Sequence, residues 1–205
     1  MSQVIHHDDH YDAEGSKIGM WLFIFTELLL FGGLFIIYSV YRFMNQDAFQ
    51  LAAEELNRTV GIINTIILLV SSMTIAMSTS ALAKRQKGTT IFLLEVTLML
   101  GLIFLINKYF EWGIKFEHGI FPGSEYMLDN LSQGEILFFG LYFVMTGLHA
   151  LHIVIGMILI GVTLAKVHNG KVNPERSSLL ENAGLYWHLV DLIWIFLFPL
   201  FYLIH

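Results

Sequence analysis

Long blocks of apolar residues, each of a length that crosses a lipid bilayer, constrain the fold of this chain more than any other feature. A helix needs about 20 apolar residues to cross the hydrocarbon core, and only helices or closed barrels satisfy their backbone polar groups there. Because 56% of the residues are hydrophobic and only 14% are charged, we predict an all-α, polytopic membrane protein. A polar N-terminal arm, residues 1–17, precedes a transmembrane domain, residues 18–205. The five predicted spans cover about residues 18–41, 59–83, 89–110, 134–166 and 184–204.

The connections between the spans carry most of the charge, and their basic residues predict the orientation of the chain. One side of the membrane receives more lysine and arginine than the other. The positive-inside rule then places the N-terminus in the cytoplasm and, after five crossings, the C-terminus outside. The richer side has Lys17, Lys84, Arg85, Lys87, Lys166, Lys171 and Arg176, and the other side has Arg42, Arg58, Lys108 and Lys115.

Composition also excludes several classes of function. The formal net charge is -6 and the basic residues are scattered, so we expect no nucleic-acid-binding surface. The chain has no cysteine, which excludes disulfides, thiolate metal sites and a cysteine nucleophile. His6, His7 and His10 lie in the N-terminal arm beside aspartates, but a terminal segment without structure fixes no ligand geometry. We therefore predict no functional metal site there.

Two histidines stand three residues apart inside the fourth span, at His149 and His152. On a helix they share one side, about one turn apart, and lipid cannot satisfy their ring nitrogens. The fifth span adds His188 and Asp191, which also share a face. A metal site would need more ligands, because di-metal membrane enzymes use several histidine-rich boxes and ferritin-like sites use a repeated Glu-x-x-His motif. We expect an internal polar network and no metal, with a stand-alone membrane metalloenzyme as the distant alternative.

Charged residues occur in two other spans. Glu27 lies about nine residues inside the first span, where a carboxylate costs about 2.5–3.5 kcal/mol on insertion scales. It is therefore expected either to pair within the bundle or to take part in proton-linked function, together with the network residues above. Lys108 and Glu111 are three residues apart near the end of the third span, flanked by aromatic residues. We expect them to form an interfacial pair that anchors the helix.

Motifs on four of these spans give the chain a family resemblance. Their order and their placement on successive helices make the signal specific, although each motif alone is short. Together they resemble subunit III of the haem–copper oxidases, in the five-span form that lacks the first two spans of larger members. The motifs are Glu27 within Gly19-Met20-Trp21-Leu-Phe-Ile-Phe-Thr-Glu27-Leu-Leu-Leu-Phe31, then Asn64-Thr65, then Thr146-Gly147-x-His149-x-x-His152-x-x-x-Gly156, and finally Tyr186-Trp187-His188-x-Val190-Asp191-x-x-Trp194.

The resemblance implies a non-catalytic subunit of a complex that reduces O2 to water and translocates protons in aerobic respiration. Haem and copper would belong to partner subunits, and this chain would contact subunit I directly, with subunit II, small subunits or a supercomplex as further partners. It would bind phospholipid, support proton uptake and stabilise the catalytic subunit in a bacterial inner membrane. Glu27 matches the family's buried helix carboxylate, and Lys166 matches a basic residue near a lipid headgroup. Lys108 before Glu111 also fits a family form.

The electron donor stays open at this point, because donor sites lie on other subunits. A cytochrome c oxidase is the main expectation. The alternatives are subunit III of a quinol oxidase and a homologue associated with a nitric oxide reductase. In the five-span form the family's lipid cleft lacks one wall, so the amount of phospholipid held by this chain alone is not fixed by the resemblance.

Overall fold

The computed structural model describes residues 13–204, and within that range the chain is helical, with no strand. Five of the helices are long and apolar enough to cross a membrane, which confirms the predicted all-α fold with five membrane-spanning helices. The histidines of the N-terminal arm, His6, His7 and His10, for which we predict no functional metal site, lie outside the described residues. The helices are α1 (Ala13–Met44), α2 (Gln46–Glu54), α3 (Arg58–Ala83), α4 (Lys87–Glu117), α5 (Glu125–Asn130), α6 (Gln133–His168) and α7 (Ser178–Tyr202).

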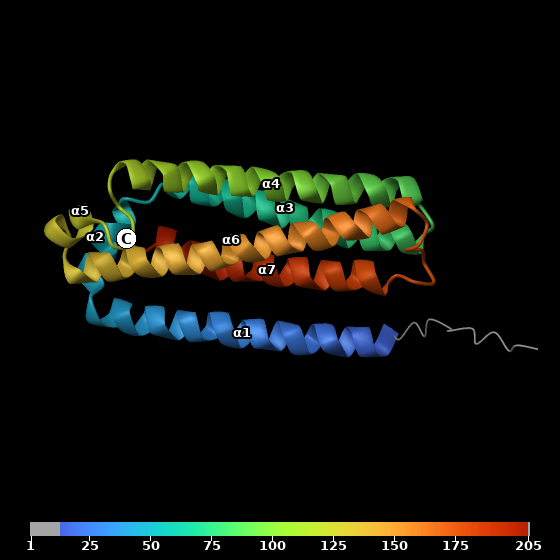
Figure 1. Cartoon of the computed structure of the whole chain (residues 1–205), viewed down its shortest axis with the longest axis horizontal. Helices are drawn as coiled ribbons and strands as arrows, with labels where there is room; N and C mark the ends of the chain where they lie inside the picture. The colour runs from blue at the N-terminus through green and yellow to red at the C-terminus, as the bar shows by residue number, and fades with distance from the viewer. Residues whose placement is uncertain (1–12, 205) are drawn as a thin grey trace, which may run out of the picture.

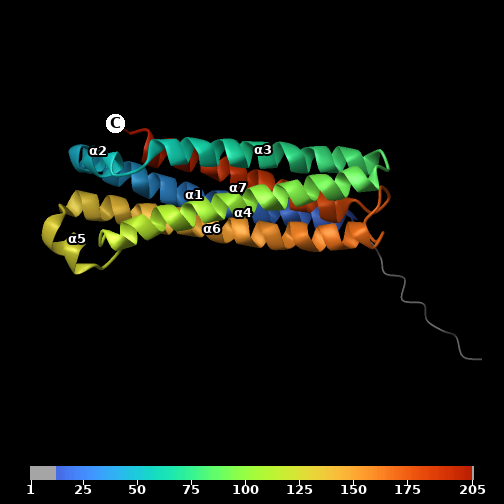
Figure 2. The same cartoon turned by 90° about the horizontal axis from the view of Figure 1, so that it is seen from above.

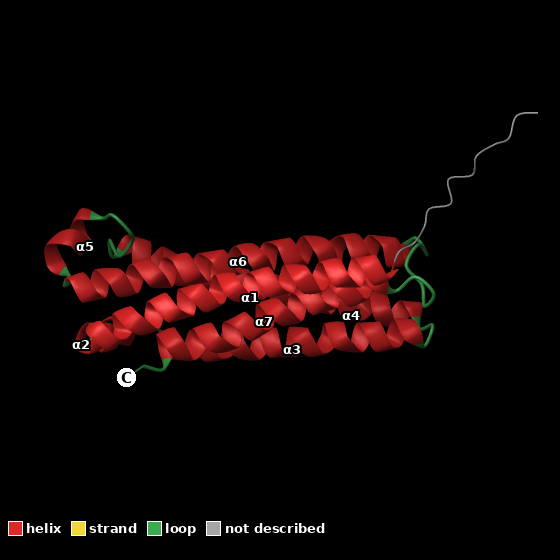
Figure 3. Ribbon diagram, turned by 90° about the horizontal axis from the view of Figure 1, so that it is seen from below, coloured by secondary structure: helices red, strands yellow, loops and turns green. Residues whose placement is uncertain are grey.

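The five long helices run side by side in one elongated bundle (Figure 1). Seen from above, the short helices α2 and α5 lie at one end, near the C-terminus, and the α3–α4 and α6–α7 connections lie at the other (Figure 2). The view from below shows α1 beginning at the end that carries these connections (Figure 3). Hence α2 and α5 lie at the end of the bundle opposite to the start of α1, where α2 packs on α6 (Figure 2).

Burial differs strongly between the helices. In the apolar stretch of α7, 56% of the residues are buried, whereas the corresponding fraction for α1 is 11%. The helix α7 is therefore the centre of the bundle, and α1 packs on its edge against α6 and α7. Tyr38 of α1 donates a hydrogen bond to the carbonyl of Leu200, and Asn182 donates to Ser16 over 2.8 Å. Polar contacts thus attach a helix that buries little apolar surface.

Glycines at two helix contacts allow the central tryptophan of α7 to pack. A Cβ atom at Gly101 of α4 would lie 2.9 Å from the Trp187 ring, and one at Gly156 of α6 would lie 2.8 Å from it. Real Cβ atoms essentially never approach so closely, and the indole is fully buried. Small residues therefore set the spacing of α4, α6 and α7, as is usual for helices in membranes.

Candidate functional site

Glu27 and His152 meet between α1 and α6. The carboxylate oxygen Oε2 of Glu27 lies 3.0 Å from Nε2 of His152, and Nδ1 of His152 contacts the Leu148 carbonyl at 2.7 Å. The two side chains are 14% and 8% exposed. Phe31 of α1 packs edge-on against the imidazole. A carboxylate that contacts an imidazole in a nearly dry site forms a pair that can share or pass on a proton.

His149, one turn before His152, has a different environment. It is completely buried, stacked on Trp194 with 5.2 Å between ring centroids and packed edge-on by Phe104. Neither ring nitrogen has a hydrogen-bond partner among the described residues. The prediction that both histidines belong to one hydrogen-bonded network is therefore corrected: only His152 makes such contacts, because aromatic rings enclose His149.

His188 and Asp191 lie at the contact between α7 and α3. Nδ1 of His188 is 2.7 Å from the Ser72 hydroxyl. Asp191 is only 3% exposed. The Ser72 hydroxyl contacts His188, and neither oxygen of Asp191 completes a hydrogen bond within residues 13–204. This second polar contact is thus separate from the Glu27–His152 pair, and the expected single network divides into distinct contacts.

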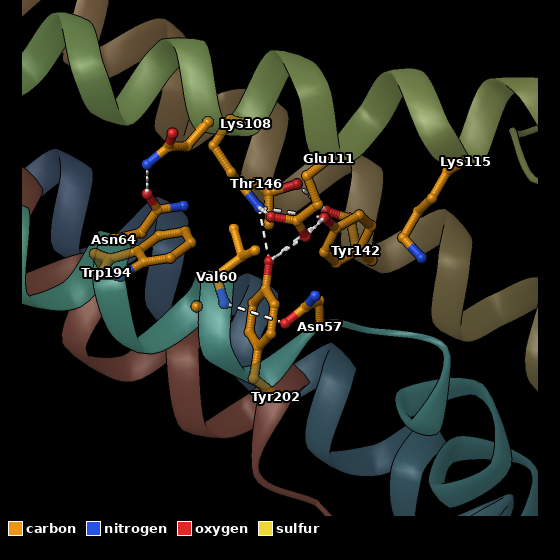
Figure 4. Close-up of polar contacts among 12 residues, drawn as sticks. Asn57, Val60, Asn64, Lys108, Glu111, Lys115, Tyr142, Thr146, Trp194 and Tyr202 are labelled. Atoms are coloured by element: carbon orange, nitrogen blue, oxygen red, sulfur yellow. Dashed lines mark hydrogen bonds and ion pairs between the residues drawn. The ribbon is translucent and has the colours of Figure 1, made fainter.

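The most densely hydrogen-bonded polar cluster joins α4, α6 and α7 (Figure 4). Nζ of Lys108 lies 3.3 Å from Glu111 Oε2, and it donates to the hydroxyls of Tyr142 and Tyr202 at 3.2 and 2.8 Å. Both tyrosines in turn donate to Glu111 Oε1, each over 2.5 Å. A buried ammonium and a buried carboxylate are tolerable when each is paired and hydrogen-bonded in this way.

This geometry corrects the interpretation of Lys108 and Glu111 as an interfacial anchor. The two residues do pair, but their side chains are only 3% and 6% exposed. The reason is that α4 continues to Glu117 and that Tyr142 of α6 and Tyr202 of α7 enclose the pair. The pair therefore stabilises the interior. Sequence analysis did not identify Tyr142 and Tyr202, since a tyrosine in an apolar span has no signal that distinguishes a hydrogen-bond donor from a packing residue.

A groove opens beside this cluster, between α3 and α4. Its volume is about 370 Å³, and both Glu111 and Lys115 line it together with Glu55. Nζ of Lys115 donates to the Glu55 carbonyl over 3.2 Å. Asn107, another residue of the groove wall, donates to Asn64 over 2.8 Å. The Lys108–Glu111 cluster is thus reached from the surface at the α2 end.

The remaining predicted positions lie apart from these contacts. Lys166 is exposed near the end of α6, and its side chain forms no hydrogen bond or ion pair with a described residue. Across residues 13–204 there is no group of three or more histidine, aspartate and glutamate side chains close enough to hold a metal ion. The polar residues of this site can position helices and exchange protons.

Comparison with known proteins agrees with the family resemblance seen in the sequence. A family model described as cytochrome c oxidase subunit III matches residues 3–205. Cytochrome c oxidase subunit 3 of Thermostichus vulcanus is 31% identical over 202 residues, which cover 98% of this chain and 92% of that protein. Cytochrome bo(3) ubiquinol oxidase subunit 3 of Pseudomonas aeruginosa is 28% identical, with 96% of this chain and 89% of that protein covered. Heme-copper oxidase subunit I+III of Aeropyrum pernix is 31% identical over 96% of this chain, which spans only 24% of that longer protein.

Proposed function

Because the chain belongs to the cytochrome c oxidase subunit III family, we propose that it is the non-catalytic subunit III of a proton-pumping cytochrome c oxidase in a bacterial inner membrane. The observation that carries this proposal is the family match over residues 3–205. In the complex, haem and copper belong to partner subunits, and O2 is reduced to water there. This chain contacts subunit I directly, with subunit II in the same assembly.

The contribution that we propose for this chain is support of proton uptake and of the stability of subunit I. The contact between Glu27 and His152, 3.0 Å long and nearly buried, supports a proton-linked role for Glu27. His188 then holds α7 against α3 through Ser72, and the buried side chains of His149 and Asp191 contribute packing. The pair Lys108–Glu111 fixes α4 against α6 and α7.

Orientation and lipid binding belong to the same proposal. The basic residues Lys17, Lys87 and Lys166 lie at the end of the bundle where α1 begins (Figure 3). By the positive-inside rule this end faces the cytoplasm. The exposed ammonium of Lys166 is available to the phosphate of a phospholipid headgroup, and bound phospholipid would cover the apolar surface of the neighbouring helices.

A quinol oxidase is the second candidate. The specific observation in its favour is that a ubiquinol oxidase subunit 3, at 28% identity, resembles this chain nearly as closely as a cytochrome c oxidase subunit 3 does, at 31%. The family membership leaves the stand-alone metalloenzyme without support. The family includes oxidases of cytochrome c and of quinol, so the electron donor is decided by the experiment below.

Purification of the tagged chain in mild detergent tests the proposal. We expect the other oxidase subunits, haem and copper to co-purify, and the preparation to consume O2 with reduced cytochrome c. Consumption with quinol alone would favour the second candidate. Recovery of the chain by itself, with stoichiometric iron or zinc that a His149→Ala/His152→Ala double variant loses, would contradict both.

A further inference from the structure

Glu95 places a carboxylate on the outer, otherwise apolar face of α4. Its side chain is exposed and forms no hydrogen bond or ion pair with any residue from 13 to 204. Phe92 and Met99, about one turn away on either side, are 62% and 63% exposed. Leu102 and Ile106 continue the same stripe and are 50% and 44% exposed. In a bilayer such a stripe contacts either lipid or another helix.

The position of Glu95 along α4 makes lipid an unsuitable neighbour. Lys87 at the start of α4 donates to the His168 carbonyl at the end of α6 over 2.7 Å, which fixes this end of the two helices at the same level. Glu95 lies about 12 Å further along the axis, at about 1.5 Å per residue. Between residues 88 and 107 it is the only charged residue. Ionisable groups at membrane depth almost always face a protein interior or a polar partner.

Glu27 provides an internal comparison. It is also a carboxylate in a membrane-spanning helix, and this chain supplies His152 as its partner at 3.0 Å. For Glu95 the described part of the chain supplies none. The missing partner must therefore come from outside residues 13–204 if the carboxylate is to be satisfied.

An apolar groove adjoins the Glu95 stripe. It lies between α4 and α6 and has a volume of about 450 Å³. The exposed side chains of Val154 and Ile158, at 41% and 61%, form its α6 wall. Leu98, Met99 and Leu102 form its α4 wall, so the groove begins within one turn of Glu95. A groove of this kind accommodates the side chains of a helix that lies along it.

We propose that the α4–α6 face is the docking surface for a transmembrane helix of another oxidase subunit, and that this helix presents an arginine or lysine to Glu95. The apolar groove provides van der Waals packing, and the ion pair satisfies a carboxylate that lipid cannot satisfy. The inference rests on the proposed function only for the identity of the partner as an oxidase subunit.

Replacement of Glu95 in the tagged, assembled oxidase tests this docking surface. A partner helix and lipid, as neighbours of Glu95, predict opposite changes in how well the partner subunit is retained when the carboxylate is removed. In Glu95→Leu, an interface loses one member of a buried charge pair, and we expect about tenfold or greater loss of the partner subunit during a detergent challenge. Glu95→Gln should lose less, since it keeps a hydrogen-bond acceptor. Met99→Leu, on the same stripe, should behave as the wild type. If Glu95 faced lipid, Glu95→Leu would retain the partner at least as well as the wild type, and the proposal would be overturned.

Photo-crosslinking in the assembled oxidase provides an independent measurement that keeps Glu95 in place. A photoreactive amino acid replaces Phe92 or Met99, and the complex is illuminated after purification. We expect both positions to form covalent products with one other membrane polypeptide. Products with lipid alone would overturn the docking surface, while haem, copper and O2 consumption in the same preparation would leave the proposed function intact.

Discussion

Removal of the Glu111 carboxylate should destabilise the chain more than removal of the Lys108 ammonium, although the two groups pair with each other. In Glu111→Gln the buried ammonium keeps the hydroxyls of Tyr142 and Tyr202 but loses its counter-charge, and breaking a buried ion pair in this way costs about 3–5 kcal/mol. In Lys108→Met the carboxylate still accepts two tyrosine hydrogen bonds of 2.5 Å, which are shorter and stronger than the 3.2 and 2.8 Å hydrogen bonds left to the ammonium in Glu111→Gln. The loss is then about 1.5–3 kcal/mol, the range for one hydrogen bond to a charged group.

The assay is a double-mutant cycle on the free energy of unfolding of the full chain in bicelles. The double variant Lys108→Met/Glu111→Gln contains no buried charge at this position, so it should be no less stable than Glu111→Gln alone. The coupling energy between the two positions should then reach about 2 kcal/mol, well beyond the 0.3–0.5 kcal/mol by which independent sites depart from additivity.

An exposed ion pair in the same chain is the matched control. Lys17 and Glu181 are 2.8 Å apart, and their side chains are 51% and 33% exposed. Solvent screens this pair, so the cycle Lys17→Met/Glu181→Gln should give a coupling below about 1 kcal/mol. The predicted asymmetry would be refuted if Lys108→Met and Glu111→Gln lowered the free energy of unfolding equally and the double variant showed the sum of the two losses.

Three further outcomes are expected. Glu27→Gln should assemble normally but change the proton-to-electron ratio or the lifetime of turnover, measured in reconstituted vesicles; wild-type values of both would reduce Glu27 to a packing residue. His149→Phe should leave stability unchanged or raise it by about 1–3 kcal/mol, the cost of an unsatisfied buried polar group, in the same unfolding assay; a large loss would indicate a missing hydrogen-bond partner. Gly156→Val should drive a side chain into Trp187 and lower the yield of assembled complex, whereas Gly161→Val, where a Cβ meets nothing within 4 Å, should not.

The membrane spans were predictable because their signal is local. A run of apolar residues has the length that a bilayer demands whatever the rest of the chain does, and the structure has five helices of that kind. The need of Glu27 for a partner was predictable for the same reason. The identity of that partner was not, because His152 follows 125 residues later and reaches Glu27 only through the packing of α6 against α1.

The difference between His149 and His152 also depends on packing. A separation of three residues puts two side chains on one side of a helix, yet they still differ by about 60° around its axis at 3.6 residues per turn. That rotation is enough to place His152 against α1 and His149 against Trp194 of α7. Spacing alone therefore predicted a shared environment that the two rings do not have.

Lys108 and Glu111 show how the end of a hydrophobic block misleads. A charged pair beside aromatic residues at the end of an apolar run is typical of a membrane interface. Here the helix α4 continues beyond the block to Glu117, and Tyr142 of α6 and Tyr202 of α7 enclose the pair. The depth of a residue in the bundle thus depends on which helices pack against it, and the hydropathy of one segment does not report that packing.

The structure of α1 explains why glutamine is the informative replacement for Glu27. Since only 11% of the apolar stretch of α1 is buried, its attachment depends on polar contacts, and the Glu27–His152 contact is the one at mid-helix. Glu27→Leu would remove the proton-binding group and this contact together, so a loss of function could follow from release of α1. Glutamine removes only the titratable proton and keeps a hydrogen bond to His152, because Nδ1–H of the ring donates to the Leu148 carbonyl and the bare Nε2 can accept from the glutamine NH2 group. A defect in Glu27→Gln with α1 still docked would therefore assign proton chemistry to the carboxyl group itself.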